Sequence, residues 1–150
     1  MSVHTVFLIT HIVMGSLCLL LGAINLSIKK EKGYHTKIGG WYHICYIIVF
    51  ITSIGMAIMN WSESAYLFYI ALFSYGLAFL GYVAGKLRWT NWLTVHISGM
   101  AGSYIGIITA VLVVNGTEIP FINQIPSLLL WFVPTIIGTP FIIMVNKRYS

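Results

Sequence analysis

Residues 92–114 read WLTVHISGMAGSYIGIITAVLVV, and this stretch contains no charged side chain. A helix rises about 1.5 Å per residue, so roughly 20 apolar residues are needed to cross a hydrocarbon core about 30 Å thick. The stretch is long enough for such a crossing. It therefore predicts a membrane-spanning helix that carries one histidine, His96.

Four further stretches of the chain have the same character. The predicted spans are residues 5–28, 38–59, 65–85, 92–114 and 127–145, and short polar breaks separate them. No break is long enough to hold a second domain, and the runs lack the alternation of polar and apolar residues that marks a membrane β-barrel. Helices satisfy every backbone amide in lipid. We therefore expect an all-α fold, a single transmembrane domain of five helices over residues 1–150.

The composition of the whole chain agrees with a location in the lipid bilayer. Hydrophobic residues make up 59% of the 150 residues and charged residues only 7%, whereas about a quarter of a soluble domain is charged. This composition excludes soluble enzyme folds and intrinsic disorder. It also argues against an interpretation of the net charge of +5 as a sign of nucleic-acid binding.

The basic residues predict the orientation of the chain. They fall in the first loop, the third loop and the tail: Lys29, Lys30, Lys32, Lys37, Lys86, Arg88, Lys147 and Arg148. With five spans all of them lie on one side, and Glu63 and Glu118 lie on the other. Cytoplasmic loops carry such an excess of Lys and Arg. The N-terminus is therefore expected outside and the C-terminus inside, with the basic loops against anionic headgroups.

Histidines are the main candidates for chemistry, because no acidic residue falls within a predicted span. The chain has five, at positions 4, 11, 35, 43 and 96. Two of them lie on stripes of small and polar residues at helical spacing. These stripes are His11, Gly15, Cys18, Gly22 and Asn25 in the first span, and His96, Gly99, Ser103, Gly106 and Ala110 in the fourth. Small residues let membrane helices approach closely, so both stripes should face neighbouring helices, as should Gly81 and Gly85 in the third span.

Depth in the membrane suggests which side chains meet. His43 and His96 each lie about one turn inside a span from the cytoplasmic side, which predicts a pair that ligates haem b, or that binds a copper or zinc ion together with His35. Tyr75 and Tyr82 line a face of the third span that would flank a flat cofactor or quinone. The candidate cofactor-binding residues are His43, His96, Met100, Tyr75 and Tyr82, and the candidate metal ligands are His35, His43, His96 and His11, the last in an outer pair with His4.

A structural interpretation of the same residues stays open. A histidine on a close-packed membrane interface also serves by bonding a carbonyl or hydroxyl of the next helix, and a tyrosine stripe also serves as packing. The chain would then be a non-catalytic subunit or assembly partner, with itself or with other membrane proteins. A small-solute transporter is less supported, because the spans show no internal repeat. Cys18 and Cys45 lie within spans and imply no disulfide.

Three motifs carry a resemblance to a known family. They are His11-x3-Gly15, Gly33-Tyr34-His35-x3-Gly39 followed by Tyr42, and Trp92-Leu93-x2-His96-x3-Met100. In these the chain resembles the bacterial multi-pass membrane family called domain of unknown function 2306, over residues 11–114. The resemblance implies recurrent histidine positions and a place in the bacterial inner membrane, but no reaction. The chain departs from the pattern at Thr36, where a basic residue is expected. It also resembles, loosely, cytochrome b561-type bundles, which carry histidines on separate helices.

Overall fold

The computed structural model describes residues 2–31 and 33–149. The helices are α1 (Val3–Ser27), α2 (Tyr34–Met59), α3 (Trp61–Leu87), α4 (Trp92–Asn115) and α5 (Ser127–Tyr149), with a short 3-10 helix, η1 (Ile122–Gln124), before α5. The described residues contain no strand. Each of the five α-helices is long and apolar enough to cross a membrane. The prediction of an all-α chain with five such helices is therefore confirmed.

The helices extend beyond the predicted spans at several ends. α2 begins at Tyr34 rather than at residue 38, and α3 begins at Trp61 and so includes Glu63, which the prediction left in a loop. At the other end of the chain, α5 continues through Lys147 and Arg148 to Tyr149. Acidic groups are favourable in a first turn and basic groups in a last turn, because they oppose the helix dipole. A boundary drawn where hydropathy falls therefore ends the helix too early.

The chain forms two compact units, Met1–Tyr75 and Gly76–Ser150. The first unit contains α1, α2 and the beginning of α3, and the second contains the rest of α3 with α4 and α5. The single transmembrane domain stays a prediction.

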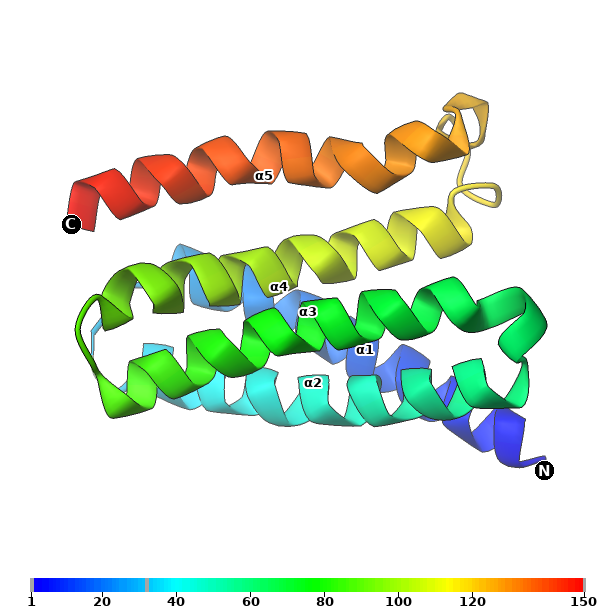
Figure 1. Ribbon diagram of the computed structural model, residues 1–150, viewed down its shortest axis with the longest axis horizontal. Coiled ribbons are helices and arrows are strands. Elements are labelled where there is room, and N and C mark those ends of the chain that lie inside the picture. Colours follow the sequence, from blue (N-terminus) through cyan, green and yellow to red (C-terminus); the bar gives the residue numbers. More distant parts are fainter. Residues whose placement is uncertain (1, 32, 150) are drawn as a thin grey trace. The chain divides into compact units, whose positions relative to one another are not determined.

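In the first unit α1 packs against α2, and the two helices run in opposite directions (Figure 1). The predicted stripe on α1 faces α2, because Cys18 and Gly22 are buried and the Cys18 thiol lies 3.7 Å from the Tyr42 carbonyl oxygen. At the end of α1 the Lys30 ammonium donates to the carbonyls of Asn25 and Leu26 at 2.7 and 2.8 Å. This bonding satisfies carbonyls that the helix end leaves without an amide partner.

In the second unit α3 and α4 meet at glycines. A Cβ atom added to Gly99 would lie 2.7 Å from the Cα of Gly81 and from the Leu77 carbonyl oxygen, so the two backbones touch. The predicted role of these small residues is confirmed. α5 packs beside α4 in the opposite direction (Figure 1), and it runs as one helix through Pro134 and Pro140.

The surfaces of both units carry many exposed apolar side chains. Ile12 on α1 is 56% exposed, Phe73 on α3 is 70% exposed and Ile136 on α5 is 66% exposed. In water such extensive apolar surface would drive association, whereas in lipid it is solvated. Cys18 and Cys45 are both buried and free, as expected of small apolar side chains in membrane helices.

Candidate functional site

The five histidines lie in different surroundings. His4 is exposed, while His11, His35 and His96 are half-buried and His43 is buried. His4 and His11 share one line on α1, and His11 bonds to α2. In the part of the chain that the structure describes, the predicted ligands thus lie in separate local surroundings.

His11 bonds to two hydroxyl groups of α2. Its Nδ1 lies 3.1 Å from the Thr52 hydroxyl and 3.3 Å from the Ser53 hydroxyl. The Thr52 hydroxyl itself lies 2.8 Å from the Ile48 carbonyl and 2.9 Å from the Val49 carbonyl, to which it donates. Because its one proton is used there, the hydroxyl accepts from the His11 Nδ1–H. The neutral ring therefore carries its lone pair on Nε2.

His96 makes a comparable bond within the second unit. Its Nδ1 lies 2.8 Å from the Gly81 carbonyl oxygen of α3. A carbonyl oxygen only accepts, so Nδ1 carries the proton, and in the neutral ring the lone pair is on Nε2. The ring fits there because its neighbour is glycine: a Cβ atom on Gly85 would lie 2.8 Å from Nδ1. Trp92 lies one turn before His96, with its ring centroid 6.3 Å from that of the imidazole.

His43 lies in an aromatic cluster of the first unit. Its ring stacks on Tyr75 with centroids 6.0 Å apart and planes 24° apart, and Tyr75 in turn stacks on Phe50 at 4.6 Å. Tyr46 contacts Tyr75 at 6.1 Å and Tyr42 at 5.5 Å. Tyr75, predicted to flank a flat cofactor, therefore stacks directly on the His43 imidazole.

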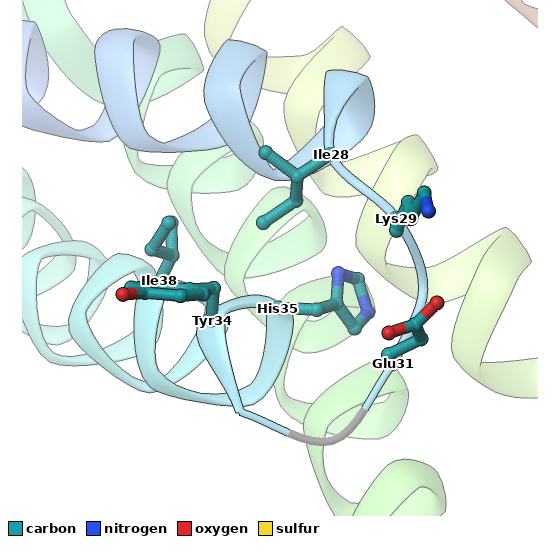
Figure 2. A pocket seen from close by; sticks show the side chains of 6 residues that line it. All are labelled: Ile28, Lys29, Glu31, Tyr34, His35 and Ile38. Atoms are coloured by element: carbon teal, nitrogen blue, oxygen red, sulfur yellow. The ribbon is translucent and has the colours of Figure 1, made fainter.

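His35 lines a surface pocket of about 290 Å³ where α1 ends and α2 begins. Figure 2 shows the pocket and the six residues around it: Ile28, Lys29, Glu31, Tyr34, His35 and Ile38. The ring of His35 lies between the loop residues and the start of α2 in this view. Three polar groups of different charge thus share one small opening.

The remaining predicted residues lie in helix contacts of the second unit. Met100 packs on α3, since a Cβ atom on Gly81 would lie 3.0 Å from the Met100 Cγ. The Tyr82 ring lies 5.4 Å from the Lys86 ammonium, a cation–π distance. Residues 2–31 and 33–149 contain no group of three or more His, Cys, Asp or Glu side chains able to hold a metal ion.

The predicted pair of ligands stays a prediction. His43 belongs to the first unit and His96 to the second, so the common depth of the two imidazoles is an expectation from the sequence. Within the first unit, His11, His35 and His43 have separate surroundings: the hydroxyls of α2, the surface pocket and the aromatic cluster.

Several polar partners were not anticipated from the sequence. Thr52 and Ser53 bind His11, and the Asn146 amide on α5 donates to the Ser98 hydroxyl on α4 at 2.8 Å. Hydroxyl side chains inside a predicted span, such as Thr52, Ser53 and Ser98, are a signal for such interhelical bonds, whereas Asn146 lies one residue beyond the predicted fifth span. Among these contacts only the histidine had been predicted to face a neighbouring helix.

Comparison of the chain with protein-family models, with curated proteins and with solved structures finds no match in any of the three. The assignment of a function therefore depends on the geometry of the side chains.

Proposed function

We propose that the chain is an integral membrane protein that binds haem b, or a copper ion, through His96 and His43 and takes part in electron transfer. The observation that supports this proposal is the 2.8 Å bond from His96 Nδ1 to the Gly81 carbonyl. Ligating histidines in metalloproteins commonly donate their second ring nitrogen to a carbonyl, which fixes the tautomer and the ring orientation. His96 has this arrangement, and its Nε2, which carries the lone pair, is the atom that would bind the metal.

The residues around His96 and His43 fit a ligand role. The Gly81 carbonyl holds the His96 ring, and Gly85 gives that ring room beside α3. In the first unit, the stack of Phe50 on Tyr75 and of Tyr75 on His43 restricts rotation of the His43 imidazole. Bound haem or copper supplies reversible one-electron chemistry, and the protein tunes the potential through its ligands and their hydrogen bonds.

His11 favours a second candidate function. Its Nδ1–H bonds to hydroxyls of α2, and this contact joins α1 to α2. Interhelical bonds of this kind hold membrane helices together. On this view the histidines brace the fold, and the chain acts as a non-catalytic subunit or an assembly partner in the bilayer.

Absorption spectroscopy separates the two candidates. The protein is purified from cells supplied with haem precursor and copper, and its visible spectrum and metal content are measured for wild type, His43→Ala and His96→Asn. The asparagine amide keeps a donor near the position of Nδ1, so it preserves the bond to Gly81 while removing the ligand atom. His4→Ala is the matched control, because His4 is exposed.

The ligand proposal predicts a Soret band, or bound copper, in wild type and His4→Ala and its loss in the other two variants. A colourless, metal-free wild-type protein would contradict it and favour the bracing function. A bound cofactor that survives both His43→Ala and His96→Asn would also contradict the ligand proposal.

The orientation and the family are part of the same proposal. The N-terminus lies outside and the C-terminus inside a bacterial inner membrane, since all eight basic residues follow the positive-inside rule. Membership in the domain of unknown function 2306 family rests on the three histidine motifs. Reporter fusions after Lys37 and after Lys86 should both report the cytoplasm, and a fusion after Glu63 should report the exterior. An exterior signal from either lysine fusion would contradict this orientation.

A further inference from the structure

The pocket between α1 and α2 combines an apolar wall with charged groups. Ile28 and Ile38 line it together with the ring of Tyr34, and Lys29, Glu31 and His35 provide the polar groups. Figure 2 shows Ile38 and Tyr34 on one side of the opening and Lys29 and Glu31 on the other, with His35 between them. Such a pocket suits an amphiphilic ligand, whose polar end meets charge and whose carbon chain meets the isoleucines.

The size and place of the pocket favour the headgroup of a membrane lipid. A volume of about 290 Å³ is at the lower end of small-molecule sites, so it accommodates a headgroup and not a whole lipid. The pocket lies where two helices, each able to cross a bilayer, are joined by a short loop. The ends of such helices lie at the level of the lipid headgroups, and the acyl chains of a lipid held there would run along the exposed apolar helix surfaces.

The charges of the pocket favour a headgroup with both signs. Lys29 contributes one positive charge and Glu31 one negative charge, whereas the ammonium of Lys30 already bonds to two carbonyls at the end of α1. Gly33 provides no side-chain cap for α2, so the first-turn amides of α2 add a weak attraction for a phosphate near Lys29. The Glu31 carboxylate is the acceptor in this pocket for a cationic group of the same ligand.

We infer that this pocket binds the headgroup of a phospholipid that carries a phosphate and a primary ammonium, the phosphatidylethanolamine class. The phosphate meets Lys29 and the start of α2, and the ammonium donates to Glu31. A choline headgroup has no N–H to donate, and a glycerol headgroup has no cation. This ligand is independent of the proposed cofactor.

Lipid retention by the purified protein tests this inference. Dioleoyl phosphatidylethanolamine, phosphatidylcholine and phosphatidylglycerol are each titrated into the protein in a neutral detergent, and bound lipid is counted by native mass spectrometry. We expect wild type to bind phosphatidylethanolamine about fivefold more tightly than either other lipid, the effect of about one charge contact near a membrane surface. Lys29→Gln should weaken the binding of phosphatidylethanolamine and of phosphatidylglycerol.

Glu31→Gln is the decisive variant, because it should remove the preference for phosphatidylethanolamine over phosphatidylcholine. Glu63→Gln is its matched control, since Glu63 is an exposed acid in the first turn of α3. Far-UV circular dichroism checks that each variant keeps its helices. Equal binding of the three lipids by wild type would overturn the inference, as would a preference that survives Glu31→Gln. Soluble phosphoethanolamine is titrated as well, and binding as tight as that of the lipid would overturn the assignment to a membrane lipid.

Discussion

The hydrogen bond between His96 and Gly81 allows a quantitative prediction about the second unit. The bond is 2.8 Å long and joins α4 to α3, where the backbones touch at Gly99. Interhelical hydrogen bonds in membrane proteins contribute about 0.6 kcal/mol on average and at most about 1.7 kcal/mol. His96→Ala removes this bond together with the ring, whereas His96→Asn removes most of the ring and keeps a donor.

The expected magnitudes follow from what each variant leaves behind. The Gly81 carbonyl lies within α3, which continues to Leu87, so it keeps a helical amide partner when the imidazole is removed. No orphaned acceptor is created, and the loss of the bond itself should cost about 1 kcal/mol. The void left by a half-buried ring adds to this, so we expect His96→Ala to lower the free energy of unfolding by about 2 kcal/mol. His96→Asn should cost about 1 kcal/mol less than His96→Ala.

Reversible unfolding in mixed micelles of neutral detergent and dodecyl sulfate, followed by far-UV circular dichroism, measures these differences. A difference of about 1 kcal/mol corresponds to about a fivefold change in the unfolding equilibrium constant. Equal losses in the two variants would refute the argument, because the retained donor would then have no effect. His4→Ala serves as the reference for an exposed histidine and should leave the transition unchanged.

Three further predictions concern other contacts. Gly99→Ala should destabilise the protein by about 1–3 kcal/mol, because its new Cβ meets the backbone of α3. Gly76→Ala is the control and should not destabilise it, because no atom lies within 4 Å of the added Cβ. Equal stabilities of the two variants in the mixed-micelle unfolding experiment would contradict this prediction. Thr52→Val removes the main acceptor of His11 and should cost about 1 kcal/mol, and an unchanged transition would contradict the bond. Partial burial lowers the pKa of Lys30 in the folded chain below its ordinary value of 10.5. At a pH between the lowered pKa and 10.5 the unfolded chain binds more protons than the folded chain, so the free energy of unfolding should rise with pH there. Lys30→Met should remove that rise, and an identical pH profile in the variant would contradict it.

The helices and their contact faces were predictable because lipid allows few solutions. An apolar stretch in a bilayer must satisfy its own amides, which makes it a helix, and glycine spacing marks the face along which backbones approach. The stripe through Cys18 and Gly22 faces α2, and Gly81 meets Gly99, as these two rules imply. Neither rule depends on which helix is the neighbour.

The partners of the histidines were not predictable in the same way. His11 bonds to Thr52 and Ser53 because of the register between α1 and α2, which the connecting loop sets. In that loop Lys30 caps α1 and Gly33 adopts a φ of 119°. Hydropathy contains no information about such a register, since sliding one helix by a turn leaves its apolar content unchanged. The stacking of Tyr75 on His43 depends on register in the same way.

The two candidate functions of His96 require the same hydrogen bond, so stability alone does not separate them. A brace needs the Nδ1–H bond to Gly81, and a ligand needs that bond in order to present Nε2. Two variants separate the ring nitrogens: the amide of His96→Asn keeps a donor near the position of Nδ1, whereas the amide of His96→Gln reaches the position of Nε2 and keeps no donor at Nδ1. If His96 only braces, His96→Asn should be the more stable of the two variants and the wild type should be colourless. If His96 ligates, both variants should lose the cofactor while the order of their stabilities stays the same. A cofactor retained by His96→Asn would show that the imidazole is not its ligand, whatever the stabilities are.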